Sequence, residues 1–180
     1  ATRVLQRALP RPSVTLRDSE QLTWVGAALA RELEMPADTL CFDYAHDTFS
    51  NTFQVTAAQN REVDTLLTLA NALRLRLAAI APDAGALANL LSAVAPARCV
   101  AWRDQHQWLW AMRHQWGRRY TTEAATVNEL AALLALSPSD IAVFDAARDP
   151  WEAVTLCQPP LPECGADYTV ALALAMSEAP

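Results

Sequence analysis

Hydrophobic residues recur at helical spacing in two long stretches of the chain. Within residues 18–35 they stand three or four positions apart, which predicts a helix with one buried face that ends at Pro36. A second, leucine-rich stretch runs to Ile80 and follows Thr56 and Gln59, which have the spacing of a capping box. Because it is apolar on more than one side, we expect this helix at the centre of a bundle.

The tryptophan-rich stretch has two possible periods. One pattern predicts a helix from Asp104 to about Trp116, with Gly117 as its C-terminal cap, because Trp108 and Met112 then share one face. The competing interpretation is a β-hairpin, since the large apolar residues in this stretch also alternate. We prefer the helix.

A helix, a tight turn and a second helix are expected between residues 126 and 144. Thr126 and Glu129 form a second capping box, and Ser137 followed by Pro138 is typical of a new helix start. The spacing resembles the helix-turn-helix unit of DNA-binding proteins, although Ala135 stands where a turn glycine is usual.

The remaining segments have weaker patterns. We expect an extended or partly helical arm over residues 1–17, a strand or loop over 38–52, and a helix over 84–95. Residues 151–157 and 168–176 are apolar and fit either strands or helices. If these two segments pair as strands, the C-terminal part has a winged-helix layout.

These patterns predict a mainly α fold, namely a helical bundle with a C-terminal helix-turn-helix or winged-helix-like lobe and a small β element. A low glycine content of 4, against 11 prolines, favours helices interrupted by prolines. The expected organisation is a basic extended arm at 1–17, a helical domain at 18–120 and a helix-turn-helix-like lobe at 121–180 packed on it.

Positive charge is unevenly distributed along the chain. The net charge is −6, yet residues 1–17 and residues 97–120 each carry a net charge of +4, and every basic side chain is arginine. Such a separation of charge indicates contacts with an oppositely charged surface, either within the molecule or on a partner.

Residues 97–120 also contain four of the six tryptophans, which makes this stretch the candidate binding surface. Tryptophan and arginine anchor protein interfaces more often than other residues do, because each buries a large area and still makes a directional contact. We therefore expect a non-catalytic accessory or adaptor protein that binds a partner protein or an acidic or aromatic peptide. The alternative for the rings is that they fill the core. The expected partner-binding residues are Trp102, Trp108, Trp110, Arg113, Trp116, Arg118 and Arg119.

A winged-helix-like regulator that binds nucleic acid is the first alternative function. The expected second helix of the helix-turn-helix carries Asp140 and Asp145 and no base before Arg148. This acidic face would repel phosphates, so nucleic-acid binding is possible but disfavoured.

A small metal-dependent enzyme is the second alternative. Cys99, His106 and His114 could contribute to a zinc site, but their spacing matches no known finger. An acid/base cluster could form from Asp43, His46 and Asp47. Because neither set is complete and the four glycines are isolated, we expect no catalytic residues, no metal and no cofactor.

The sequence also bears on location. No secretory signal opens the chain, and no apolar run reaches the roughly twenty residues needed to cross a bilayer. The four cysteines form no CxxC pair. We therefore expect a cytoplasmic protein with reduced thiols and no membrane segment.

Overall fold

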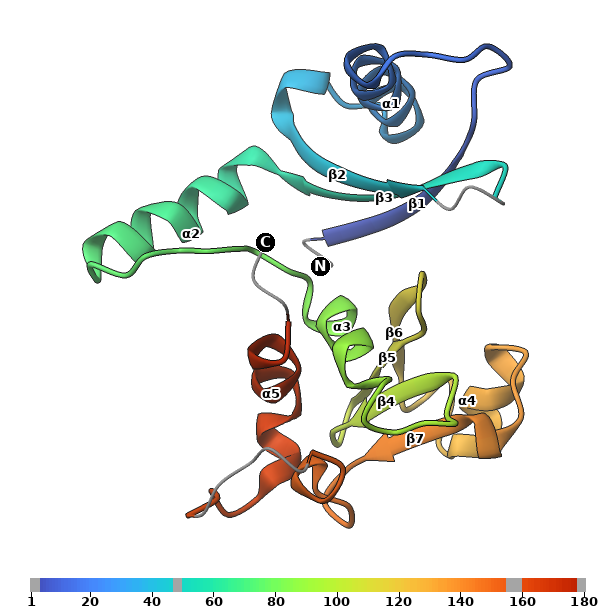
Figure 1. The fold of residues 1–180 in the computed structure, drawn as a ribbon, viewed down its shortest axis with the longest axis vertical. Coiled ribbons are helices and arrows are strands. Elements are labelled where there is room, and N and C mark those ends of the chain that lie inside the picture. The colour runs from blue at the N-terminus through green and yellow to red at the C-terminus, as the bar shows by residue number, and fades with distance from the viewer. Residues whose placement is uncertain (1–3, 47–49, 155–159, 178–180) are drawn as a thin grey trace. The chain divides into compact units, whose positions relative to one another are not determined.

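The protein consists of two compact units, Ala1–Ala78 and Ala79–Pro180, in a computed structural model (Figure 1). The structure describes residues 4–46, 50–154 and 160–177. The division between the units falls inside the expected helical domain at 18–120.

The first unit contains a three-stranded antiparallel sheet. β1 (Val4–Pro10) and β2 (Leu40–His46) both pair with β3 (Thr52–Gln59), which lies between them. α1 (Asp18–Leu33) connects the two outer strands across one face of the sheet, as Figure 1 shows, so the unit is a split β-α-β arrangement. A short 3-10 turn, η1 (Ala37–Thr39), leads from α1 into β2.

Alternation along β3 explains how this sheet holds its helix. Phe53 and Val55 point to the same face and are buried against Val25 and Leu29 of α1. The helix expected over residues 18–35 is therefore confirmed. Of the residues that helical spacing placed on its buried face, Val25 and Leu29 are buried and Leu33 packs beside them, whereas Leu22 is 51% exposed.

The helix expected after Thr56 and Gln59 is shorter and more exposed than the sequence suggested. Thr56 belongs to β3, where it pairs with Gln6 on one side and Asp43 on the other, so it cannot act as a helix cap. α2 (Asn60–Ala72) begins only after the strand ends, and Ala70 is its one buried residue. The expectation of a central bundle helix is wrong.

The second unit contains a four-stranded sheet with the order β6-β5-β4-β7. β4 (Cys99–Arg103), β5 (Gln107–Ala111) and β6 (Trp116–Tyr120) form an antiparallel meander, and β7 (Ile141–Phe144) pairs in parallel with β4. Both faces of this sheet are covered, so its central strands are buried on both sides.

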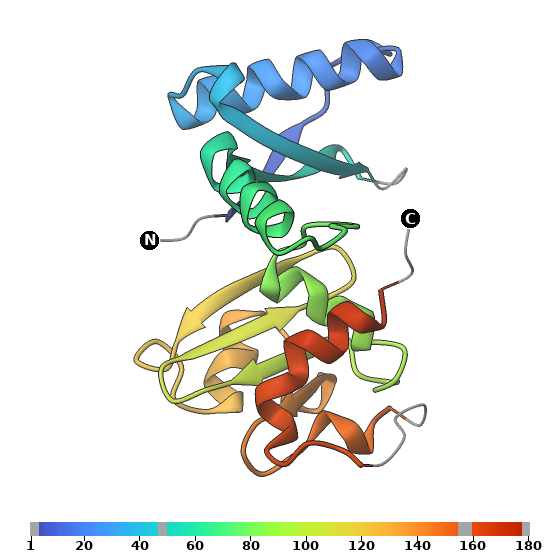
Figure 2. The same cartoon turned by 90° about the vertical axis from the view of Figure 1, so that its left-hand side faces the viewer.

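Helices form a layer on each side of this sheet. α4 (Val127–Leu133) covers one face, and α3 (Asp83–Ala86), the 3-10 turn η2 (Leu87–Leu90) and α5 (Thr169–Ala175) cover the other. Figure 2 shows α3 and α5 on the near side of the sheet and α4 behind it. The helix expected over 84–95 is reduced to α3 and η2.

The predicted mainly α bundle is therefore wrong, because the chain is a mixed α/β protein with two sheets. Three segments that the sequence left open or placed in helices pair as strands. The extended arm at 1–17 contains β1, the segment at 38–52 contains β2, and the tryptophan-rich stretch contains β5 and β6. The strand at β2 agrees with one of the two forms expected for 38–52, whereas β1 forms by pairing with the distant strand β3 and β5 and β6 form by pairing with each other.

The helix-turn-helix is also corrected. The first helix forms as α4, and the Thr126 hydroxyl accepts a hydrogen bond from the Glu129 N–H at 3.3 Å, which confirms the capping box. Ser137 and Pro138 then start only a 3-10 turn, η3 (Pro138–Asp140), before the chain enters β7. Within the described residues 137–154 no α-helix forms, so the expected second helix of the helix-turn-helix is absent.

The winged-helix layout fails as well. The segment at 168–176 is helical and forms α5 after the 3-10 turn η5 (Gly165–Tyr168). The segment at 151–157 begins in the 3-10 turn η4 (Pro150–Glu152), and residues 155–157 lie outside the described residues. The end of the chain therefore supplies a covering helix where the sequence suggested a hairpin. None of the helices in the described ranges is long and apolar enough to cross a membrane.

The buried thiol of Cys99 gives a test of the second sheet. Burial raises the pKa of Cys99 to about 12, whereas Cys41 and Cys164 are exposed. In a variant with Cys41, Cys157 and Cys164 replaced by serine, the remaining thiol should react with a disulfide reagent at pH 8 at least ~100-fold more slowly in the folded protein than in urea, because thiolate is the reacting species.

A variant that keeps only Cys41 is the control for that measurement. It should react at similar rates with and without urea. Equal rapid labelling of both variants in the folded state would contradict the burial of β4.

Candidate partner-binding surface

The tryptophan-rich stretch is a β-hairpin, not the helix that we preferred from the sequence. β5 and β6 pair in antiparallel register from Gln107 opposite Tyr120 to Ala111 opposite Trp116. The Met112 N–H donates to the Gln115 carbonyl at 2.7 Å and closes a tight turn. The competing hairpin interpretation is therefore confirmed.

Asp104 fixes the turn that leads into this hairpin. Its Oδ1 accepts hydrogen bonds from the N–H groups of His106 at 2.7 Å and Gln107 at 2.8 Å. Partial burial opposes ionisation of the carboxyl, but these hydrogen bonds outweigh burial, so the pKa of Asp104 is lowered. The turn is therefore held best when Asp104 is ionised.

Trp108 lies inside the unit. Its side chain is 1% exposed, and its indole N–H donates to the Ala124 carbonyl at 2.7 Å. The guanidinium of Arg103 covers the ring from 5.0 Å. This residue therefore joins β5 to the segment before α4 and is not available to a partner.

Trp110 is also buried, and its position depends on a glycine in the neighbouring strand. A Cβ atom at Gly117 would lie 2.8 Å from Cζ2 of the indole ring, closer than real atoms approach. The indole nitrogen is buried with no hydrogen-bond partner in the described part of the chain, so packing rather than hydrogen bonding positions the ring. The ring of Trp110 therefore packs directly against the backbone of β6 at Gly117.

The other two tryptophans of the stretch are half-buried. The Trp102 N–H donates to the Ala166 carbonyl at 2.6 Å, which connects β4 to η5. Trp116 packs beside α3, where a Cβ on Gly85 would lie 3.4 Å from the ring. Only Trp116 stands on the outer strand of the sheet.

The three arginines differ in exposure and in whether their guanidinium groups already have a partner within the chain. Arg118 Nη2 lies 2.5 Å from Asp83 Oδ2 on α3, in an ion pair with both side chains partly exposed. Arg119 is half-buried and donates to the Arg118 carbonyl at 3.3 Å. Arg113 is exposed in the hairpin turn and has no ion pair within the described ranges.

The residues that remain accessible form what we call the β6 edge surface. Among the described residues β6 has a strand neighbour on one side only, and at its end the Tyr120 N–H donates to Glu123 Oε2 at 2.8 Å while the Tyr120 carbonyl accepts the Glu123 N–H at 2.9 Å. Tyr120, which the sequence reasoning missed, is 59% exposed at the end of this strand. The signal for it was its alternation with Trp116 and Arg118. The surface consists of Arg113, Trp116, Arg118, Arg119 and Tyr120.

The other candidate sites are not assembled in the described residues. His106 and His114 lie in the two turns at opposite ends of β5, which separates them. No group of three or more His, Cys, Asp or Glu side chains in the described ranges could hold a metal ion. The carboxylate of Asp43 accepts the N–H of Tyr44 at 2.8 Å on β2, and Asp47 lies outside the described residues.

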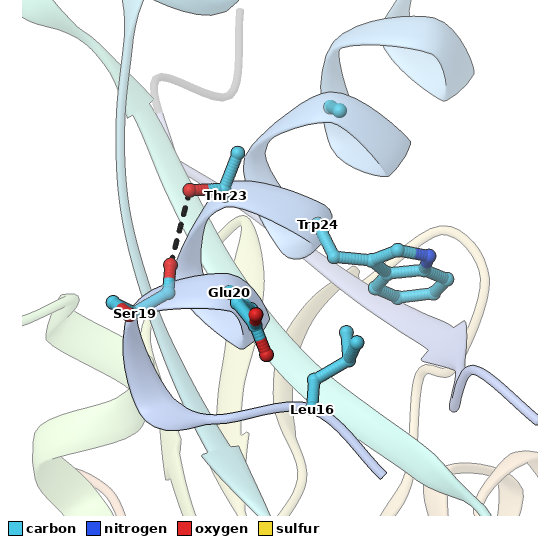
Figure 3. A pocket seen from close by; sticks show the side chains of 6 residues that line it. Leu16, Ser19, Glu20, Thr23 and Trp24 are labelled. Atoms are coloured by element: carbon cyan, nitrogen blue, oxygen red, sulfur yellow. Dashed lines mark hydrogen bonds between the residues drawn. The ribbon is translucent and has the colours of Figure 1, made fainter. Parts of the chain in front are cut away.

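A shallow groove of about 470 Å³ lies along the start of α1 (Figure 3). Trp24 and Leu16 form its apolar side, and the Thr23 hydroxyl donates to the Ser19 carbonyl at 3.0 Å. The Glu20 carboxylate accepts the Arg17 N–H at 2.8 Å and so caps the helix. The groove therefore offers contact area but no arrangement for acid or base chemistry.

The fold is that of a mixed α/β protein built from two small units, each with its own sheet. No family model matches the chain. The structure is similar to Cyto-EpsL, the cytoplasmic domain of EpsL, an inner membrane component of the type II secretion system of Vibrio cholerae, with a TM-score of 0.62. The likeness covers 98% of this chain and 71% of that chain at 14% identity, so it concerns the fold.

Sequence comparison identifies the family. The chain is 48% identical over 181 aligned residues to the DNA utilization protein HofM of Escherichia coli strain K12. The match covers 99% of this chain and 70% of HofM. The chain therefore belongs to the HofM family.

Gly117 tests the support that Trp110 gives to β6. Replacement by alanine should lower the free energy of unfolding by about 1–3 kcal/mol, because the added methyl displaces the ring. Urea denaturation measures this change. Gly85→Ala is the matched control, since its Cβ would meet Trp116 only at 3.4 Å. If both variants lost the same stability, the packing described for Trp110 would be wrong.

Asp104 gives a prediction of pH dependence. A lowered folded-state pKa means that ionised Asp104 stabilises the protein above its ordinary pKa of 3.8, and that this stability is lost as the pH falls through the folded-state pKa. Asp104→Asn should therefore reduce stability by about 1 kcal/mol at pH 7. The difference from the unsubstituted protein should shrink as the pH falls below 4, and a pH-independent difference would contradict the assignment.

Proposed function

We propose that this chain is a non-catalytic assembly component that binds a partner protein or peptide along the β6 edge surface. The observation that carries the proposal is an edge strand with arginine and tyrosine side chains outside and buried tryptophans beneath. A partner would bind this edge through the side chains of the strand, because the N–H and carbonyl of Tyr120 and the carbonyl of Arg118 already have hydrogen-bond partners within the chain.

Charge indicates what kind of partner fits. Arg113 and Arg119 offer guanidinium groups beside the strand, whereas Arg118 is already paired with Asp83. Guanidinium groups bind carboxylates in a two-point geometry, and Tyr120 adds an exposed ring. The best-fitting partner is therefore an extended peptide with acidic side chains and an apolar or aromatic residue.

The fold likeness supports a proposal for the setting of the interaction. Cyto-EpsL is the cytoplasmic domain of an inner membrane component of a secretion system. By analogy, we propose that this chain works on the cytoplasmic side of a membrane-bound assembly. The partner would then be the cytoplasmic segment of another component.

DNA binding is the second candidate because HofM is named a DNA utilization protein. The recognition helix expected from the sequence is absent, and η3 and β7 take its place. The β6 edge surface offers few basic groups for phosphates. We therefore favour a role in which the protein supports DNA utilization through a protein contact, and retention on duplex DNA at low and high salt distinguishes the two.

Site-specific photo-crosslinking in the native host tests the proposal. A benzoyl-phenylalanine side chain at Tyr120 should crosslink to one defined partner, because this residue stands at the exposed end of the edge strand. The same group at Tyr168, which is 45% exposed and far along the chain, should not. Mass spectrometry of the products identifies the partner.

Charge reversal then tests the role of the arginines. Arg113→Glu with Arg119→Glu should reduce the Tyr120 crosslink at least ~10-fold, since two favourable charge contacts become repulsive. Arg31→Glu, an exposed substitution on α1, is the control. Equal crosslinking from both positions, or a yield unaffected by charge reversal, would reject the β6 edge surface.

A further inference from the structure

The second half of α2 and the residues after it expose an unusual number of leucines. Ala70 is the one buried residue of this helix, although its sequence is strongly apolar on one side. Isolated exposed leucines are common in proteins, but a contiguous group of them marks an interaction surface. We call this group the α2 face, and it consists of Leu66 at 45%, Leu67 at 42%, Leu69 at 54%, Leu73 at 59%, Leu75 at 62% and Leu77 at 41% exposure.

The α2 face has two parts with different periods. Leu66, Leu69 and Leu73 follow helical spacing. After the helix, Arg74 adopts a left-handed conformation with φ of 54°, and the Leu75 N–H returns to the Ala70 carbonyl at 2.9 Å. The chain then reverses into a segment where leucine alternates with arginine, as in a strand.

This segment has the pattern of a strand but lacks a partner strand. Residues 75–78 belong to no helix or strand of the structure. A helix followed by an alternating strand, both apolar on one side, is normally completed by a sheet that pairs with the strand and packs under the helix. That sheet is missing from the described part of the first unit, whose own three strands are β1, β3 and β2.

Family membership suggests where the sheet comes from. The chain matches 70% of HofM, so 30% of HofM lies outside the match. Because 181 aligned residues make up 70% of HofM, the remaining 30% is roughly 80 residues, which is enough to form a small sheet with its covering helices. We propose that the α2 face docks onto a β-sheet formed by the region that HofM has beyond the matched part, and that residues 75–78 add to its edge as a strand.

A second copy of this chain is a poorer occupant. If residues 75–77 of two copies paired symmetrically about Arg76, the two Arg76 side chains would stand directly opposite each other. Like charges in directly opposed positions destabilise an antiparallel pair. An edge strand with acidic or polar side chains opposite Arg76 avoids this repulsion. The proposal concerns a surface of the first unit and does not depend on the β6 edge surface.

Hydrogen exchange provides the test without any substitution. Two proteins are compared, the 180-residue chain and the same chain joined to the additional region of HofM in the order found in HofM. The amides of residues 75–78 should exchange at least ~100-fold more slowly in the longer protein, because they gain strand partners. The amides of residues 13–16, in the segment before α1, should exchange equally in both. Rapid exchange at 75–78 in the longer protein would overturn the proposal.

Substitutions on the α2 face make the test specific. Leu75→Asp should lower the melting temperature of the longer protein by several degrees and leave that of the 180-residue chain unchanged, because only the longer protein buries this side chain. Thr68→Asp, on the exposed opposite side of α2, is the matched control. A second copy of the chain could instead cover the α2 face. In that case the 180-residue chain would have the mass of a dimer, and its residues 75–78 would become more protected from exchange as the protein concentration rises. This result would also overturn the proposal.

Discussion

The second unit depends on indole rings that are held inside it. Trp108 donates its N–H to the carbonyl of Ala124, and Trp102 donates to the carbonyl of Ala166. The first bond connects β5 to the segment before α4, and the second connects β4 to η5. An indole N–H that is removed from water without an acceptor costs stability, so these bonds help to hold the rings in place. These contacts explain why so many tryptophans occur in one short stretch, and they leave other side chains of the hairpin, such as Tyr120 at the end of β6, exposed.

The local signals in the sequence were more reliable than the overall fold. The helix at α1 and the capping box of Thr126 follow from the chemistry of neighbouring residues, and both could be predicted. β7 could not, because Ile141–Phe144 follows a strong helix-start signal and becomes a strand only by pairing in parallel with β4. The helix predicted around Trp108 is wrong for a different reason, because alternation and helical spacing are both present in a short apolar run.

The candidate site was predictable in position but not in composition. High aromatic and arginine content drew attention to the hairpin, yet the exposure of each residue depends on which face of the sheet its side chain takes. Trp110 and Gly117 lie opposite each other on the face that α4 covers, whereas Trp116 and Tyr120 lie on the other face of the edge strand. Sequence alone cannot assign these faces until the strand period is known, so buried supports and exposed contacts were grouped together.

Exchange of the indole N–H protons is the most direct test of this account. In a proton–nitrogen spectrum recorded after transfer into D2O, the Trp108 indole signal should persist long after that of Trp24, because Trp108 is 1% exposed and hydrogen-bonded whereas Trp24 lines an open groove. Loss of both signals at the same rate would contradict the buried position of the ring, and with it the assignment of β6 as a surface supported from within.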